Sequence, residues 1–145
     1  IKEMIKQNVV FVENKAGSLK RVTGIIADNG INIYGFACFD APEFAIFRMI
    51  CDNPDKAEMI LNQRGYMNRI TQAIVVDMKD QVGGLDELLK VAADSNVSLD
   101  YIYTSFHRKD LRPVVILQAE DGAVTECILK NNGFNVFTSA EELEK

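Results

Sequence analysis

The residues best suited to bind a small molecule lie in two short segments, "NKAGSL" at 14–19 and "DQVGGL" at 80–85. The first combines an amide (Asn14), a glycine (Gly17) and a hydroxyl (Ser18), and it stands between an apolar run and a segment with helical periodicity. A glycine lets a ligand approach the backbone closely, because it has no side chain. The chemistry that these residue types predict is reversible binding of a small ligand.

The same segment also has a purely structural interpretation. Asn14 is a common turn residue, and Ser18 is a common helix cap. A single copy of "NxxGSL" favours this plain strand-to-helix connection, whereas two copies at matching positions favour ligand binding. The residues alone leave both interpretations open.

No group of residues has the composition of a catalytic site. The single histidine, His107, lies in "SFHRKDLR", a polar segment that predicts an exposed loop. His107 with Arg108, Lys109 and Arg112 is an alternative anion site, but the segment favours a solvated loop. The sequence contains no "GxxxxGKS/T", "GxGxxG" or "HExxH" motif. We therefore predict that the protein is not an enzyme and has no catalytic residue, no metal site and no cofactor.

The two candidate loops belong to a duplicated unit of about 70 residues, which is too long for a short solenoid repeat. Residues 13–36 match residues 79–102 at a shift of 66, and residues 53–66 match residues 121–134 at a shift of 68. The matched pairs include Gly17 with Gly83, Leu19 with Leu85, Asp28 with Asp94, Ile33 with Leu99, Ile60 with Ile128 and Gly65 with Gly133. The loops must therefore occupy equivalent places in two similar folds.

Each repeat predicts the same order of elements, from β-branched runs, apolar residues at helical spacing, and capping residues. The predicted strands are 9–12, 32–39, 44–50 and 67–71 in the first repeat, and 74–76, 98–106, 114–117 and 134–138 in the second. One helix follows each glycine loop, and a second helix begins after a cap at Asn53 or Asp121 and stops at Gly65 or Gly133. The tail "SAEELEK" predicts one further capped turn.

This order, β-α-β-β-α-β, predicts an α+β fold of two tandem ferredoxin-like units, each an antiparallel sheet with helices on one face. We place the domains at 1–72 and 73–145. Strands such as "VVFV" and "VVIL" do not alternate between apolar and polar residues, which is typical of sheets that are covered on both faces. We therefore expect a homodimer or a tight pairing of the two units.

Composition and charge exclude several other classes of protein. The chain has 145 residues and a net charge of −5; residues 1–73 carry +1 and residues 74–145 carry −6. Ferredoxin-like sheets also bind RNA through exposed aromatic residues, for which Phe11, Phe44 and Phe47 are candidates, but neither half has the basic surface of a nucleic-acid-binding protein. We expect no nucleic acid partner.

Further features of the sequence concern the cellular compartment of the protein. No apolar run approaches the length of a membrane helix, and the first residues lack the apolar core of a signal peptide. The three cysteines, Cys38, Cys51 and Cys127, resemble neither a disulfide framework nor a zinc site. Their pattern favours buried small hydrophobic residues in a reducing compartment. We expect a cytoplasmic protein that does not associate with a membrane.

The two repeats resemble the ACT domain, the small regulatory module of amino-acid metabolism. The resemblance rests on a strand that ends in Asn/Asp-x-x-Gly-x-Leu, a helix, and then "GINI" in the first repeat or "NVSL" in the second, and it covers nearly the whole chain. The family usually has a proline before the glycine, where this sequence has Ala16 and Val82. The second repeat also has Ser98 where the first has Asn32, so the two copies need not bind ligand equally well.

The resemblance implies that a free amino acid binds between two ACT copies, at the glycine loop and the start of the second strand. The helix N-terminus would hold the carboxylate, Asn14 and Asn32 could bind either charged group, and Asp80 could pair with the ammonium group. The implied ligand-binding residues are Asn14, Ala16, Gly17, Ser18, Leu19, Asn32, Ile33, Asp80, Val82, Gly83, Gly84, Leu85, Ser98 and Leu99.

The predicted function follows from these expectations. We expect a non-enzymatic regulatory protein that binds a small amino acid between ACT-like units and signals to a partner by a shift between conformations. The alternative is a ligand-free dimerisation module, or a regulatory subunit of an enzyme of amino-acid metabolism. The sequence names neither the amino acid nor the partner.

Overall fold

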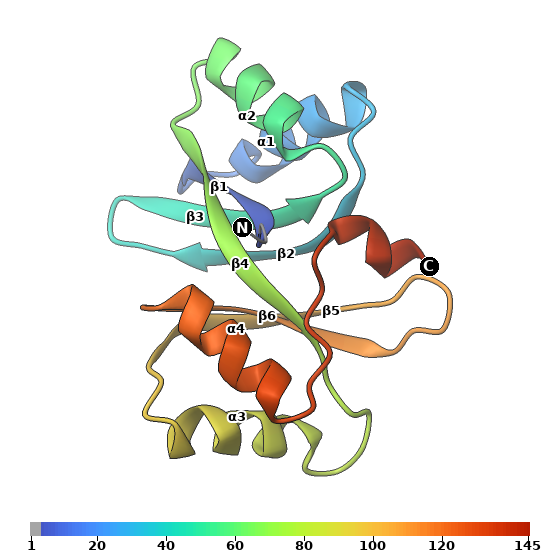
Figure 1. The fold of residues 1–145 in the computed structure, drawn as a ribbon. Helices are drawn as coiled ribbons and strands as arrows, with labels where there is room; N and C mark the ends of the chain where they lie inside the picture. Colours follow the sequence, from blue (N-terminus) through green and yellow to red (C-terminus); the bar gives the residue numbers. More distant parts are fainter. Residues whose placement is uncertain (1–3) are drawn as a thin grey trace. The chain divides into compact units, whose positions relative to one another are not determined.

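The structure is a computed structural model that describes residues 4–145 of the chain (Figure 1). By its internal contacts the chain divides into an N-terminal unit, Lys6–Thr71, and a C-terminal unit, Gln72–Lys145, with which Met4 and Ile5 also group. Within the described residues, no helix has both the length and the apolar character needed to cross a membrane.

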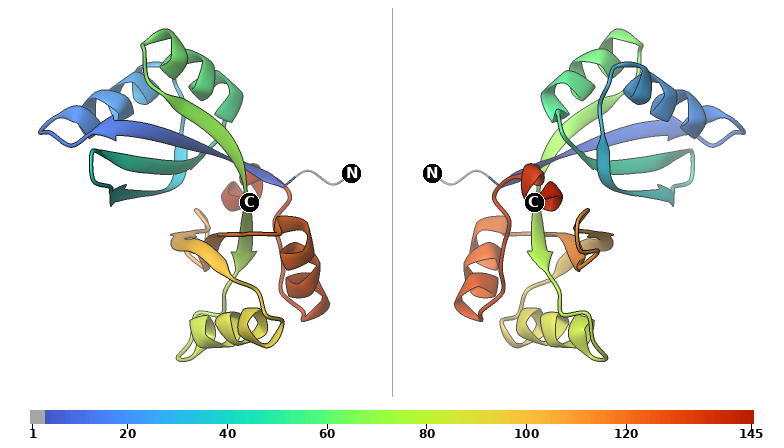
Figure 2. Two further views of the ribbon diagram at one scale, coloured as in Figure 1. Left: turned by 90° about the vertical axis from the view of Figure 1, so that its left-hand side faces the viewer. Right: turned by 90° about the vertical axis from the view of Figure 1, so that its right-hand side faces the viewer.

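The N-terminal unit repeats the predicted order of elements. Its elements are β1 (Ile5–Glu13), α1 (Ser18–Asp28), β2 (Ile33–Asp40), β3 (Phe44–Cys51), α2 (Pro54–Gln63) and the first part of β4 (Asn68–Asp77). The strands are ordered β2-β3-β1-β4, and β3 is antiparallel to both β1 and β2. Both helices lie on one face of this sheet (Figures 1 and 2). Their core side chains include Val22, Ile26, Phe47, Met49 and Leu61.

The C-terminal unit is built on the same plan. It contains the second part of β4, α3 (Gly84–Asp94), β5 (Leu99–Phe106), β6 (Pro113–Ala119), α4 (Gly122–Asn131) and the 3₁₀ helix η1 (Ala140–Glu144). The strands are ordered β4-β6-β5, with antiparallel pairing throughout. Its core includes Val76, Leu88, Val115, Leu117 and Leu129. The prediction of two α+β, ferredoxin-like units is confirmed.

Two details of the predicted strands are wrong. The segments 67–71 and 74–76 form one continuous strand, β4, since neither glycine nor proline interrupts it. The segment 134–138 makes only a bridge from Val136 to Val76, flanked by backbone hydrogen bonds. The chain then turns away into η1, where Ser139 caps the helix and Leu143 is fully buried.

The predicted caps are confirmed. The side chains of Asn53 and Asp121 accept hydrogen bonds from the backbone N–H groups of Lys56 and Val124, at the starts of α2 and α4. Proline at the first position of α2 loses no helical hydrogen bond there. These caps fix where the second helix of each unit begins.

Candidate functional site

The two glycine loops have the same backbone geometry in both units. Gly17 is the N-cap of α1 with φ 84°, and Gly83 is the N-cap of α3 with φ 85°. Such positive φ values favour glycine. A Cβ at either position would meet no atom within 4 Å. The glycines are therefore required by the backbone conformation, and open space remains beside them.

Neither helix has a side-chain cap at this end. No side-chain hydrogen bond caps α1 or α3, whose N-cap residues are glycines. Ser18 is the first residue of α1, so the interpretation of Ser18 as the cap is wrong. The first N–H group of each helix, at Ser18 or Gly84, donates to a backbone carbonyl of the loop, Lys15 or Gln81. The N–H groups that follow have no side-chain cap, and such groups suit an anionic ligand.

Asn14 and Asp80 occupy equivalent places but have different surroundings. The Asn14 side chain donates hydrogen bonds to Asp40 Oδ1 at 3.0 Å and to the carbonyl oxygen of Ala41 at 3.1 Å, which ties the loop to the β2–β3 turn. Asp80 is exposed. The N–H groups of the Asn14 amide therefore have a structural role.

The apolar residues of the predicted site are exposed around the loops. Val82 is fully exposed, Leu19 and Leu85 are more than a third exposed, and Ala16 is also exposed. Gly84 differs, because a Cβ there would lie 2.0 Å from the carbonyl oxygen of Lys79. Gly84 is thus explained by close packing of the loop rather than by access for a ligand.

The starts of the second strands lie far from the loops of the same unit. Asn32 and Ile33 follow α1, whereas Gly17 precedes it, and the 11 residues of α1 span about 16 Å. The backbone N–H of Asn32 donates to Asp52 Oδ1 at 3.1 Å. Ser98 and Leu99 follow α3 in the same way, and Ser98 lines an open cavity of about 640 Å³ beside the start of α4. Within one unit, loop and strand start do not meet.

Each unit also contains a cavity beside its glycine loop, which the sequence analysis missed. The cavity of the N-terminal unit has a volume of about 420 Å³, and that of the C-terminal unit about 400 Å³. The first is lined by Phe11, Glu13, Ser18, Arg21, Ile25, Arg64, Gly65, Tyr66 and Met67. The second is lined by Asp77, Met78, Lys79, Asp80, Glu87, Arg112, Pro113, Asn132, Gly133, Phe134 and Asn135. The repeat relates the two cavities, so comparing charges at matched positions could have found them.

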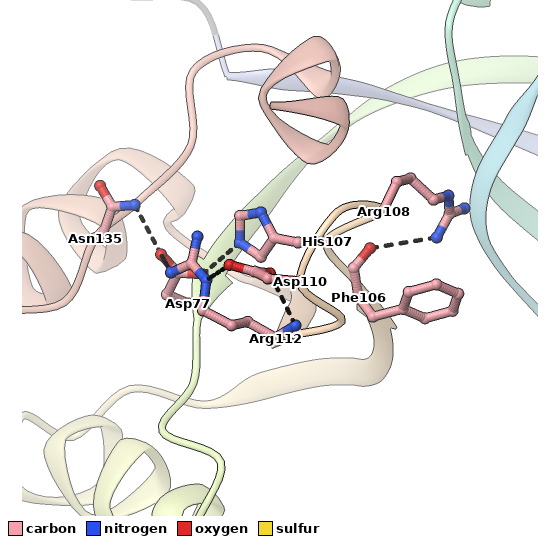
Figure 3. A network of polar contacts seen from close by, with 7 residues as sticks. All are labelled: Asp77, Phe106, His107, Arg108, Asp110, Arg112 and Asn135. Atoms are coloured by element: carbon pink, nitrogen blue, oxygen red, sulfur yellow. Dashed lines mark hydrogen bonds and ion pairs between the residues drawn. The ribbon is translucent and has the colours of Figure 1, made fainter.

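His107 is buried, although residues 109–112 of the same loop are exposed, so the prediction of an exposed loop holds for those residues and is wrong for His107. Its side chain is 4% exposed, and Nε2 lies 2.8 Å from Asp77 Oδ1 (Figure 3). The ring also packs edge-to-face on Phe137, with the centroids 5.1 Å apart. The chain that follows α4 brings Phe137 to this place, and this long-range contact left no local signal around "SFHRKDLR".

The basic residues next to His107 do not converge on an anion site. Arg108 packs on the ring of Phe106, 4.4 Å from its centroid, and Arg112 pairs with Asp110 at 2.6 Å (Figure 3). The backbone N–H of Arg112 and its guanidinium lower the pKa of the exposed Asp110 carboxyl. Asp77 also accepts from Asn135 Nδ2 at 2.8 Å. The alternative anion site around His107 therefore finds no support.

We predict that a thiol reagent modifies Cys38 and Cys127 in the folded protein but Cys51 only after unfolding. The three cysteines are free, and the expectation that all are buried is wrong for Cys38 and Cys127. The thiol of Cys51 donates to Asn8 Oδ1 at 3.3 Å, and burial raises its pKa to about 11. Since the thiolate is the reactive form, Cys51 should react slowly. Peptide mapping after iodoacetamide treatment tests this, and early modification of Cys51 would contradict it.

Comparisons with known proteins agree with this geometry. A family model described as an ACT domain pair matches residues 3–144. Protein BT0572 from Bacteroides thetaiotaomicron has 26% sequence identity and a TM-score of 0.87, covering 97% of this chain and 96% of its own. The ligand-free regulatory subunit of aspartate kinase from Thermus thermophilus has 14% identity and a TM-score of 0.62, covering 92% and 96%. The corresponding subunit from Thermus flavus has 12% identity and a TM-score of 0.61, covering 88% and 90%. Among curated proteins, none matches this chain.

Proposed function

Because this chain belongs to the ACT domain pair family, we propose that it is a non-enzymatic regulatory protein that binds a small amino acid. The ligand would lie at an interface between ACT-like units, and its binding would shift the conformation that a partner recognises. One observation carries the proposal: both units present a helix N-terminus without a side-chain cap, behind a glycine in the left-handed conformation. The fold that this chain shares with regulatory subunits of aspartate kinase supports a regulatory role.

The chemistry of the loops matches the two charged groups of an amino acid. The first-turn N–H groups of α1 or α3 would bind the carboxylate. Asp80, or the carbonyl oxygen of Asn14, would accept from the ammonium group. The exposed side chains of Leu19 and Leu85 would contact an apolar ligand side chain. Asn32, Ile33, Ser98 and Leu99 would complete the site only from a second unit, which a homodimer or a paired unit would supply.

The experiment that tests the proposal is a measurement of melting temperature against each of the twenty amino acids. A ligand at a hundredfold excess over its dissociation constant should add about 2.7 kcal/mol to the free energy of unfolding. A rise with one amino acid or a chemically related group is the expected result. If the melting temperature stays unchanged with all twenty, the amino-acid proposal fails.

Gly17→Asn is expected to reduce the ligand-induced shift in melting temperature while changing stability little. Asparagine tolerates the left-handed conformation better than other residues with side chains, and its side chain would fill the open space beside α1. Gly133→Asn is the matched control, since Gly133 has φ 86° and the same open space but lies outside the proposed site. An equal loss of ligand response in both variants would contradict the proposed position of the ligand.

A ligand-free dimerisation or regulatory subunit of an amino-acid-metabolism enzyme is the alternative function. The hydrogen bonds of Asn14 favour it, because they engage the amide N–H groups in holding the β2–β3 turn. The exposed apolar side chains of Val82 and Leu85 would then contact protein instead of ligand. A stable dimer that responds to no amino acid would support this alternative.

A further inference from the structure

We propose that the cavity beside α1 in the N-terminal unit binds the oxyanion group, phosphate or carboxylate, of a small molecule. This cavity has a volume of about 420 Å³ and is built entirely from residues of one unit. The size is within the range of small-molecule sites. The proposal therefore stands whether or not an amino acid binds between units.

Ser18 supplies a hydroxyl group to the lining of this cavity. Ser18 lines the cavity although it is only 6% exposed. Within residues 4–145, its hydroxyl group has no hydrogen-bond partner, and its backbone N–H donates to Lys15. The hydroxyl oxygen is not among the buried side-chain atoms that lack a partner, so it keeps contact with the cavity, where a ligand oxygen would meet it. The hydroxyl lies at the start of α1, where the helix dipole favours negative charge.

Two arginines make the walls of the cavity positive. Arg21 and Arg64 both line it and are exposed, and neither has an ion pair within the part of the chain that the structure describes. The only carboxylate in the lining, Glu13, pairs with Lys15 at 2.8 Å and interacts more weakly with the charge of Arg21. A guanidinium group suits a phosphate or carboxylate, because it can donate two parallel hydrogen bonds. Tyr66 and Ile25 add apolar surface for the rest of a ligand.

The equivalent cavity of the C-terminal unit lacks the hydroxyl group and both arginines at the matched positions. Its lining has Glu87 at the position of Arg21 and Asn132 at the position of Arg64, whereas Gly84, which matches Ser18, does not line it. Gly84 has no room for a hydroxymethyl group, because a Cβ would lie 2.0 Å from the carbonyl oxygen of Lys79. Its one arginine, Arg112, pairs with Asp110 at 2.6 Å. The chain therefore contains a negative control for the anion site.

The test is an NMR titration of the full chain with inorganic phosphate and, separately, with succinate, at constant ionic strength. Saturable shifts of the Ser18, Gly65 and Tyr66 amides, without shifts at Gly84 and Gly133, are the expected result. Saturation by phosphate alone or by succinate alone assigns the oxyanion class. If neither anion gives saturable shifts at these amides, the proposal is overturned.

Variants make the test specific. Arg21→Glu and Arg64→Asn, which introduce the residues of the second repeat, should each weaken binding roughly tenfold. Ser18→Ala should weaken it by a smaller factor without changing the melting temperature. Arg69→Glu is the control, since Arg69 is exposed in the same unit but outside the cavity. An equal loss in Arg69→Glu and Arg21→Glu would overturn the proposal, because it would indicate a general effect of charge.

Discussion

Replacing Gly84 by alanine is expected to lower the free energy of unfolding by about 3 kcal/mol, because the new Cβ would overlap the backbone of the preceding loop. An ideal Cβ at Gly84 lies 2.0 Å from the carbonyl oxygen of Lys79 and 3.1 Å from its carbonyl carbon. Both are backbone atoms, so no rotation of a side chain can relieve the contact. Urea unfolding of the variant and the unchanged protein measures the difference.

The matched control is Gly24→Ala, inside α1. A Cβ at Gly24 would meet only the mobile end of the Lys20 side chain, at 3.2 Å. Since alanine is a better helix former than glycine, this change should stabilise the protein by about 0.5–1 kcal/mol. Opposite signs for the two glycine-to-alanine changes are therefore expected. A Gly84→Ala variant as stable as the unchanged protein would show that the loop at Lys79 is free to move.

His107→Ala should destabilise the protein by about 3 kcal/mol, since it leaves a cavity against Phe137 and removes the partner of a half-buried carboxylate. The imidazole is 4% exposed, and its Nε2 lies 2.8 Å from Asp77 Oδ1. Asp77→Asn should cost less, about 1 kcal/mol, because the amide keeps the shape and its oxygen can still accept from Nε2. The same unfolding measurement applies to both variants.

Lys109→Ala provides the control for His107. Lys109 lies two residues along the same loop but is exposed, so its removal should change stability by less than about 0.5 kcal/mol. If His107→Ala and Lys109→Ala have the same small effect, the buried pair contributes nothing to stability. The role assigned to His107 would then be wrong.

The sequence predicted the fold well where local signals were strong. The caps at Asn53 and Asp121, and the periodic helices between capping residues, required only neighbours along the chain. Because the sequence is repeated, most helices and strands could be predicted from two separate segments. The segment 134–138 was mistaken for a strand because its residues favour one, while the buried Leu143 and the cap at Ser139 draw the chain into η1. The burial of Leu143 involves residues far apart in the chain, so the residue types of the segment 134–138 alone do not reveal it.

The candidate site was less predictable than the fold. The glycine loops were found from their spacing, and the left-handed φ of Gly17 and Gly83 agrees with the glycine. The burial of His107 depends on Asp77, which lies 30 residues before it in the chain, and on Phe137, which lies equally far after it. The role of Gly84 depends on where the carbonyl of Lys79 points. Neither fact follows from residue types.

The two repeats therefore share a backbone and differ in chemistry. The first has an amide loop and a cavity with two arginines, whereas the second has an acidic loop and a cavity with Asp77, Asp80 and Glu87. Two loops with the same backbone conformation but different side chains can keep one fold and bind different ligands. We expect unequal ligand affinity at the two loops, as the residues at 32 and 98 also indicate.

The most direct test of amino-acid binding is the amide NMR spectrum of the full chain, recorded with and without each of the twenty amino acids. The account predicts that at least one amino acid shifts the amides of Gly17 and Ser18, or of Gly83 and Leu85, in a saturable manner. It also predicts smaller shifts at the strand starts, Ile33 or Leu99. Spectra that no amino acid changes at either loop would contradict it.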